Sequence, residues 1–326
     1  MPSPLVAGKA VRIRTLREMS RRFHHTDFDP DALADGRELT VSVCLPAHNE
    51  AATVGSIVAA VRESLVERVE LVDEILVLDD GSTDDTASVA TEAGATVVPV
   101  DSVLPELPAG TGKGNALWKS LYASRGDVVC WLDADIRNFS PHFVTGLLGP
   151  LLGPAEPVDG VAFTKGFYHR PIGPVARGGG RVTELMVRPL LSQCFPELAG
   201  FVQPLAGEYA GRRELLEAIP FVEGWGVEIA MLIDVARRIG LDGIAQVDLG
   251  VRAHRNRPLD ELGPQALAVL VTVLRRAGLA ANDGITALRR FDSELHEEVV
   301  AVETRERPPM TTVPAYRTRV RGGLST

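Results

Sequence analysis

Two carboxylates at the end of an apolar run have the residue types and spacing of a metal site. Residues 128–132 read VVCWL, and Asp133-Ala134-Asp135 follows at once. Charged side chains are costly to bury and are normally excluded from such runs, so two aspartates there require a partner. Mg²⁺ and Mn²⁺ prefer oxygen ligands and commonly share their coordination shell with a diphosphate. The alternative is a helix cap on the following segment, a role for which aspartate is favoured.

Two further polar segments end apolar runs in the same way. Pro46-Ala47-His48-Asn49-Glu50 follows the run 39–45, and Asp79-Asp80-Gly81-Ser82 ends the run 74–79. In a parallel sheet, ligands bind beyond the carboxyl ends of the strands, so the three polar segments should meet at one crevice. Carboxylates that converge there repel one another unless a cation lies among them.

The elements that must position these groups alternate along the chain. Strand-like apolar runs are found at 39–45, 74–79, 95–100 and 127–132, and helical patterns at 51–67, 86–93 and 112–125. Continuous apolar strands that alternate with helices are typical of a parallel sheet wound on both faces. The sequence therefore predicts an α/β fold with a Rossmann-like, doubly wound, mostly parallel sheet.

Composition limits the class of protein. The 326 residues are 45% hydrophobic and 24% charged, which fits one large α/β domain with appendages or two domains. A net charge of −9 argues against a nucleic-acid or membrane-surface binder, so neither partner is expected. The three cysteines lack CxxC spacing, which argues against a disulfide framework or a zinc site. Because no signal segment or membrane-spanning stretch is found, a cytoplasmic location is expected.

Two glycine-rich segments are candidate anion sites. Gly110-Thr111-Gly112-Lys113-Gly114-Asn115 is not a P-loop, but Lys113 at a helix start could offer its ammonium to a diphosphate. Taken alone, Lys113 reads better as a solvated lysine in a turn. Gly178-Gly179-Gly180 enters a helical pattern at Arg181, where backbone N–H groups and a guanidinium could bind an anion, helped by the basic residues 252–257. The alternative is a hinge and a solvated arginine run.

Together these segments resemble a known group of enzymes. Residues 46–50, 79–84 and 133–135 resemble the nucleotide-sugar domain of GT-A glycosyltransferases. Residues 178–184, 203–209, 226–229 and 250–257 narrow the resemblance, which covers about 41–262, to the glucosyl-3-phosphoglycerate synthases. The resemblance implies a GT-A fold with a smaller C-terminal acceptor-binding part. It also implies retaining transfer of glucose from UDP-glucose to 3-phosphoglycerate, Mg²⁺ or Mn²⁺ as cofactor, and a homodimer.

The resemblance assigns one set of residues to the nucleotide sugar. These are Pro46, Ala47, His48, Asn49, Glu50, Asp80, Lys113, Asp133, Ala134, Trp225, Gly226, Val227 and Arg257. Asp80 and His48 depart from the family pattern, where we expect a small hydroxyl residue and an apolar residue. The residues at these two positions therefore leave the identity of the nucleobase in the donor open.

The remaining roles fall to three smaller sets. Asp135 and His254 are the expected metal ligands, and an apolar strand at 244–251 would deliver the histidine to the same sheet edge. The acceptor residues are Gly180, Arg181, Val182, Thr183 and Asn256, and those at the reacting sugar are Glu228, Arg252 and Leu205.

A general base is not among the expected roles. Glu228 is expected to hydrogen-bond the sugar hydroxyls, because in a front-face retaining transfer the departing diphosphate oxygen takes the acceptor proton. The metal, Lys113 and Arg252 would stabilise the charge on the leaving diphosphate.

Three alternatives stay open at this point. A related enzyme would use GDP-mannose to make mannosyl-3-phosphoglycerate. A nucleotidyltransferase would also use carboxylates and a lysine, but it would carry a glycine-rich loop where this chain reads PAHNE. A non-catalytic nucleotide-sugar sensor is the third.

We expect four parts along the chain. They are a partly mobile lead-in (1–38) with one short helix, a nucleotide-sugar half (39–150), an acceptor-binding and metal-completing half (151–262), and a C-terminal helix with a flexible tail (263–326).

Overall fold

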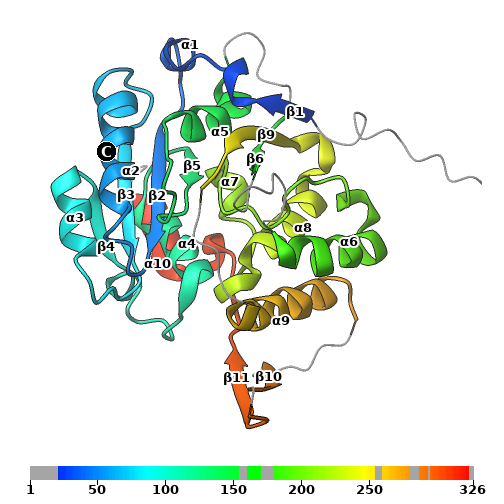
Figure 1. Ribbon diagram of the computed structural model, residues 1–326. Coiled ribbons are helices and arrows are strands. Elements are labelled where there is room, and N and C mark those ends of the chain that lie inside the picture. Colours follow the sequence, from blue (N-terminus) through cyan, green and yellow to red (C-terminus); the bar gives the residue numbers. More distant parts are fainter. Residues whose placement is uncertain are drawn as a thin grey trace, which may run out of the picture.

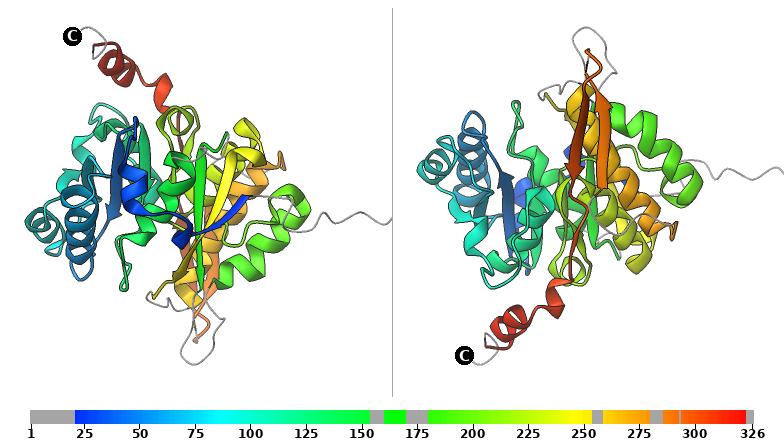
Figure 2. Two further views of the ribbon diagram at one scale, coloured as in Figure 1. Left: turned by 90° about the horizontal axis from the view of Figure 1, so that it is seen from above. Right: turned by 90° about the horizontal axis from the view of Figure 1, so that it is seen from below.

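The computed structural model describes residues 21–153, 160–169, 180–253, 259–279, 286–292 and 294–322. These residues form an eight-stranded sheet in the order β1-β9-β6-β7-β5-β2-β3-β4, a β10–β11 hairpin and a short β12–β8 pair. Helices lie on both faces of the large sheet (Figure 1, Figure 2), which confirms the predicted α/β class.

The strands have the following bounds: β1 Arg21–His24, β2 Val41–Ala47, β3 Glu74–Asp79, β4 Thr96–Pro99, β5 Val128–Trp131, β6 Phe163–His169, β7 Tyr209–Arg212, β8 Phe221–Val222, β9 Ile244–Val251, β10 Thr286–Phe291, β11 Glu297–Val302 and β12 Glu306–Arg307. The α-helices have the following bounds: α1 Pro30–Ala34, α2 Val54–Val61, α3 Thr86–Ala93, α4 Gly112–Ala123, α5 His142–Leu152, α6 Arg188–Cys194, α7 Arg213–Leu216, α8 Val227–Ile239, α9 Leu259–Arg276 and α10 Pro314–Gly322.

The sheet separates two hydrophobic cores. Cys44 lies in the core that contains side chains of α4 and α8, whereas its neighbours Val43 and Leu45 lie in the core with α2 and α5. Successive side chains of a strand point to opposite faces, so a strand buried on both sides must be apolar throughout. This explains the continuous apolar run of β2.

One strand of the large sheet runs against its neighbours. β7 is antiparallel to both β5 and β6, whereas the other adjacent pairs are parallel. The carboxyl ends of β2, β3, β5, β6 and β9 therefore share an edge with the amino end of β7. The segment that precedes β7 reaches the crevice for this reason.

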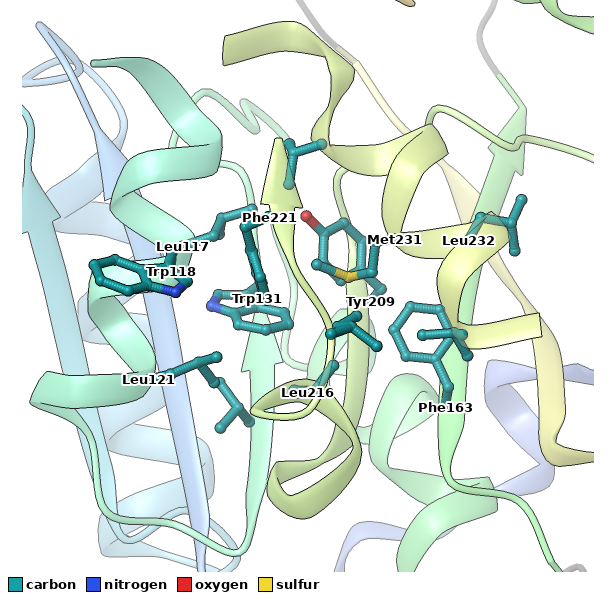
Figure 3. Close-up of a cluster of buried hydrophobic side chains, with 14 of the residues drawn as sticks. Leu117, Trp118, Leu121, Trp131, Phe163, Tyr209, Leu216, Phe221, Met231 and Leu232 are labelled. Atoms are coloured by element: carbon teal, nitrogen blue, oxygen red, sulfur yellow. The ribbon is translucent and has the colours of Figure 1, made fainter. Parts of the chain in front are cut away.

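An aromatic cluster fixes β5 and β7 beneath that edge. The ring of Trp131 packs edge-on against Tyr209, with centroids 5.4 Å apart, and against Phe221, at 6.0 Å (Figure 3). The indole N–H of Trp131 donates to Ser120 Oγ at 2.8 Å, so its polar atom is satisfied in the core. Because Asp133 lies two residues beyond Trp131, this cluster gives the carboxylate a rigid base.

The lead-in contributes more than the expected short helix. That helix is present as α1, with Asp29 Oδ1 accepting from the Ala32 N–H at 3.0 Å as its N-cap. In addition, β1 pairs in parallel with β9 at the edge of the large sheet. A four-residue strand with half-buried side chains is too short to be recognised from its periodicity. Residues 1–20 lie outside the described part.

The expectation of a flexible C-terminal tail is wrong for the described residues beyond 285. They form β10, β11, β12 and α10, and Met310, Val313 and Tyr316 are buried against the main core. The apolar residues of this segment are dispersed among arginines and prolines, so no continuous pattern reveals their burial. Across the described residues, no helix combines the length and apolar character needed to cross a membrane.

Candidate active site

A cavity of about 820 Å³ opens at the edge where the three polar segments end. It brings together most of the residues expected at the site. They are Pro46, Ala47, His48, Glu50, Asp80, Lys113, Asp133, Ala134, Asp135, Gly180, Arg181, Val182, Thr183, Leu205, Trp225, Glu228 and Arg252. The predicted convergence of strand ends on one crevice is therefore present in the structure.

A few expected residues are placed elsewhere. Asn49 does not line the cavity; its Oδ1 accepts from the Thr83 N–H at 2.8 Å and braces the loop after β3. Gly226 and Val227 are buried at the start of α8 and do not line the cavity. Outside the described residues lie His254, Asn256 and Arg257.

The floor of the cavity is an ion-pair network centred on Asp133. Lys113 Nζ donates to Asp133 Oδ1 and lies 2.8 Å from Glu228 Oε1. On the other side, Arg252 Nη2 donates to Asp133 Oδ2 at 2.9 Å and to Asp135 Oδ1 at 2.6 Å. Asp133 thus joins the start of α4 to the end of β9.

Burial and mutual attraction oppose each other in this network. Burial alone would raise the pKa of Asp133, but Lys113 and Arg252 hold that pKa well below its ordinary value. Burial likewise works against the charged form of Lys113, yet Asp133 and Glu228 raise its pKa well above the ordinary value. The ammonium and the carboxylate therefore both stay charged at neutral pH.

Glu208 is a member of the network that the sequence did not single out. It is fully buried just before β7, with Oε1 3.0 Å from Arg252 Nη1. Tyr168 OH accepts from the same nitrogen at 2.7 Å. Glu208 lies inside the segment 203–209. Its place at the site could have been predicted only if β7 had been recognised as an antiparallel strand.

Lys165 is a second residue that sequence reasoning missed. Its side chain is buried, and Nζ donates to the Ala206 carbonyl oxygen at 2.8 Å. Burial lowers the pKa of Lys165 from 10.5 to about 8, against the attraction of Glu228. The lysine lies within the apolar-flanked strand β6, where nothing in the pattern indicates a functional group.

The carboxylates of the cavity have the chemistry of a metal site. Both oxygens of Asp133 are engaged, whereas Asp135 Oδ2 accepts no hydrogen bond from the described residues and its side chain, 35% exposed, lines the cavity. Four carboxylates pair with the cations Lys113 and Arg252, and Lys165 is a third cation close to them, which leaves an excess of one negative charge. Oxygen ligands and this excess fit Mg²⁺ or Mn²⁺. No three His, Cys, Asp or Glu side chains within the described ranges form a metal cluster, and the expected second ligand, His254, lies outside them.

Close backbone approach explains two of the glycines at the site. A Cβ on Gly114 would lie 1.9 Å from the Val222 carbonyl oxygen, so α4 can pack against β8 only with glycine there. A Cβ on Gly207 would lie 2.3 Å from Asp133 Oδ1. Glycine at 207 therefore leaves the space that the Asp133 carboxylate occupies.

Asp80 and His48 line the cavity beside the start of α4. The Gly112 N–H donates to Asp80 Oδ2 at 3.0 Å, and His48 Nδ1 lies 2.9 Å from the Asp80 carbonyl oxygen. Burial raises the pKa of the Asp80 carboxyl above its ordinary value. This part of the cavity wall therefore contains a carboxyl group whose charged form is disfavoured by burial.

The opposite wall contains the expected acceptor segment. Gly180 has φ +81° and its carbonyl oxygen accepts a hydrogen bond from the Glu184 N–H at 3.0 Å, so the helix that leads into α6 begins there. Arg181 and Thr183 line the cavity, and Leu262, Gln265 and Val269 of α9 line it as well. A helix start with a guanidinium is a favourable place for an anion.

Comparison with known proteins adds independent evidence. The family model described as glycosyl transferase family 2 matches residues 42–171. A glucosyl-3-phosphoglycerate synthase of Mycolicibacterium smegmatis is 50% identical over 290 residues, covering 87% of this chain and 93% of the relative.

Solved structures agree over most of the chain. A crystal structure of glucosyl-3-phosphoglycerate synthase from Mycobacterium tuberculosis with Mn²⁺, UDP-glucose and phosphoglyceric acid has a TM-score of 0.77 and 48% identity, and it covers 86% of this chain and 93% of that one. A second structure of the enzyme from the same organism, in complex with Mg²⁺ and UDP, has a TM-score of 0.78 and 45% identity. The match covers 90% of this chain and 98% of the chain in that structure.

Proposed function

The chain belongs to the glucosyl-3-phosphoglycerate synthase family, and on that premise we propose that it transfers glucose from UDP-glucose to 3-phosphoglycerate. One observation carries the proposal: a single cavity contains both the Asp133 network and the Gly180–Thr183 helix start. The first suits a metal-bound diphosphate and the second suits an anionic acceptor. Glycosyl transfer between them needs no further site.

For the donor, we assign the uridine to Pro46, Ala47, His48, Glu50 and Asp80, and the diphosphate to Lys113 and Arg252. Asp135, together with His254, would hold Mg²⁺ or Mn²⁺, which supplies positive charge to the leaving diphosphate. The Lys113 ammonium and the Arg252 guanidinium are already held in place by carboxylates, so they need little reorganisation when the donor binds.

At the reacting sugar, Glu228 is placed to hydrogen-bond hydroxyls rather than to act as a base. Its carboxylate pairs with Lys113 at 2.8 Å and is largely buried. In a retaining transfer on one face of the sugar, the departing diphosphate oxygen accepts the proton of the acceptor hydroxyl. Leu205 lines the cavity beside these groups and limits the position of the hexose.

For the acceptor, we assign Gly180, Arg181, Val182, Thr183 and Asn256. 3-Phosphoglycerate carries a phosphate and a carboxylate, and an arginine at a helix start can bind either of them. In this division, residues 39–150 supply most of the donor site, while 151–262 supply the acceptor site and complete the metal site.

We further propose a homodimer in the cytoplasm. The β10–β11 hairpin extends away from the body (Figure 1, Figure 2), and its outward face includes Phe291 and Val299, which are 65% and 56% exposed. The inner face of the hairpin packs on α9, so the exposed apolar side chains of the outer face are the ones that a second copy would cover. The three cysteines are free thiols, as in most cytoplasmic proteins.

Initial rates with purified protein and 3-phosphoglycerate test the function. UDP-glucose should be the preferred donor, and removal of divalent ions with EDTA should abolish transfer. GDP-mannose is the comparison donor, because the Asp80 carboxylate could accept the N–H groups of guanine. Faster transfer from GDP-mannose would change the donor assignment. UDP binding without transfer from either donor would overturn the acceptor assignment.

A further inference from the structure

The C-terminal strand β12 lies directly behind the glycine-rich segment of the cavity. It pairs antiparallel with β8, placing Arg307 opposite Phe221, and the Glu223 N–H donates to the Arg305 carbonyl oxygen at 2.8 Å. This pairing brings the Arg307 side chain to the start of α4, although the two segments are far apart in the sequence. The side chain is only 7% exposed.

Arg307 makes three kinds of contact there. Its Nε lies 2.7 Å from Glu223 Oε1 and donates to Asn115 Oδ1 at 3.0 Å. Its guanidinium lies over the Trp118 ring, 5.4 Å from the centroid. The Trp118 indole N–H in turn donates to the Pro308 carbonyl oxygen at 2.7 Å, which fixes the strand from the other side.

The Arg307–Glu223 ion pair also contacts the backbone that leads to Lys113. Against the larger effect of burial, which raises the pKa of the Glu223 carboxylate, the backbone N–H of Thr111 favours the charged form and so lowers that pKa. A Cβ on Gly110 would lie 1.9 Å from Arg307 Nη2 and 2.4 Å from Glu223 Oε1, so the glycine backbone packs directly on the pair. Residues 110–113 line the cavity, whereas Arg307 does not.

We propose that Arg307 is a positioning residue of the donor site. Together with Glu223, it fixes the backbone of residues 110–113 so that the Lys113 ammonium meets the diphosphate of the nucleotide sugar. The inference rests on the proposed function and deepens it, since it makes the C-terminal strand part of donor recognition. Lys113 then depends on a residue about two hundred positions later in the chain.

The test compares Arg307→Met with a matched control, Arg213→Met. Arg213 is also largely enclosed, with its side chain 14% exposed, and its guanidinium donates to the Gly126 and Leu121 carbonyl oxygens and to Ser124 Oγ. It follows the carboxyl end of the antiparallel strand β7, so it lies at the sheet edge opposite the cavity. Both variants lose a largely enclosed, hydrogen-bonded arginine, but only Arg307 contacts the segment that leads to Lys113.

Three quantities are measured: the Kd for UDP in the presence of Mn²⁺, the KM for the acceptor, and amide hydrogen exchange of residues 110–116. Arg307→Met should raise the UDP Kd about tenfold, speed exchange in this segment and leave the acceptor KM unchanged. Arg213→Met should lower the melting temperature with unchanged UDP Kd and unchanged exchange at 110–116. Arg307→Lys should recover part of the UDP affinity, because it keeps a charge opposite Glu223.

Two outcomes overturn the inference. One is an Arg307→Met variant with wild-type UDP affinity and wild-type exchange at 110–116. The other is an Arg213→Met variant whose UDP Kd and exchange at 110–116 change as much as those of Arg307→Met. That result would show that both changes come from a general loss of stability.

Two further arms cover a failure to fold and a failure of the proposed function. If Arg307→Met does not fold, the double variant Glu223→Gln/Arg307→Met removes the buried carboxylate, whose remaining cation would be the exposed Arg305 at 3.4 Å, and should fold with the same weakened UDP binding. Wild-type UDP affinity in that variant counts against the inference. If the wild-type protein does not bind UDP with Mn²⁺, the proposed function fails, and the exchange data alone decide the positioning role.

Discussion

The Arg252 guanidinium lies within 3.0 Å of three carboxylates, those of Asp133, Asp135 and Glu208. Burial works against its charge, yet Glu208 and the aspartates raise the pKa of Arg252 well above its ordinary value. A buried ion pair of this kind adds little net stability, but removing one partner leaves an uncompensated charge. Arg252 therefore supports the fold, and in the proposed reaction it also stabilises the negative charge on the leaving diphosphate.

Arg252→Met should lower the free energy of unfolding by about 3–5 kcal/mol, because Glu208 is left buried without its cation. The double variant Arg252→Met/Glu208→Gln should recover most of that stability, but glucosyl transfer should stay absent in both. Urea unfolding and initial rates measure the two effects. Recovery of activity together with stability in the double variant would contradict the assigned role of the arginine.

Lys165 provides a prediction on pH. Its pKa is lowered by burial to about 8 from an ordinary value of 10.5, so between these values the unfolded chain binds more protons than the folded one. Stability from this group is therefore full above pH 10.5 and is lost as pH falls towards 8. The free energy of unfolding of wild type minus that of Lys165→Met should rise by about 3 kcal/mol from pH 7.5 to 10.5. A difference independent of pH would show that burial does not lower the pKa of this lysine.

Among the elements, β7 does most to complete the site. It has four residues, Tyr209–Arg212, and its antiparallel direction brings the preceding segment to the carboxyl edge of its neighbours. The long apolar runs of β2, β3 and β5 could be predicted from sequence because both of their faces are buried. The sequence YAGR carries no such signal, and the pairing of β7 depends on long-range contacts. Glu208 was missed for that reason, although the resemblance covered its segment.

Substitution of Gly207 tests the close approach before β7. In Gly207→Ala, the new Cβ would lie 2.3 Å from Asp133 Oδ1, so the carboxylate must move away from Lys113 and Arg252. We expect kcat/KM for UDP-glucose to fall about a hundredfold, since small displacements at a reacting centre cost that much.

A glycine away from the cavity provides the control for that variant. Gly36 has φ +67° with nothing within 4 Å of the added Cβ, so Gly36→Ala should lose about 1 kcal/mol of stability and keep full activity. Steady-state kinetics and thermal unfolding measure both variants. Unchanged kcat/KM in Gly207→Ala would mean that the position of Asp133 is not critical.

The C-terminal elements show a second limit of sequence reasoning. A C-terminal helix was expected within 263–326, and it is present as α9, which begins earlier, at Leu259. β12 has only two residues, and its burial depends on Arg307 meeting Glu223 and Trp118. Charged residues are normally exposed, so an arginine in a proline-rich tail gives no hint of such a contact.

At the scale of the whole molecule, the outward face of the β10–β11 hairpin is the surface that we propose for self-association. Its outward face is made of Ala287, Arg289, Phe291, Glu297, Val299 and Ala301, all exposed. The other face contacts α9, where a Cβ on Gly263 would lie 2.9 Å from Leu288 Cδ2. A face that mixes apolar side chains with both signs of charge suits association with a second copy.

The double variant Phe291→Glu/Val299→Glu should weaken self-association at least about tenfold, because like charges would meet across the proposed interface. Sedimentation velocity over a range of concentrations measures this. Thr91→Glu on the exposed surface of α3 adds negative charge away from the hairpin and should leave association unchanged. A wild-type association constant in the double variant would place the dimer interface elsewhere.

The reaction proposed for this cavity joins glucose to 3-phosphoglycerate with retention of configuration. Proton NMR of a mixture of purified protein, Mg²⁺, UDP-glucose and 3-phosphoglycerate tests it most directly. We predict one α-linked glucosyl-3-phosphoglycerate for each UDP released, and no product from Asp135→Ala. A β-linked product, release of free glucose alone, or full turnover by Asp135→Ala would contradict the proposed reaction.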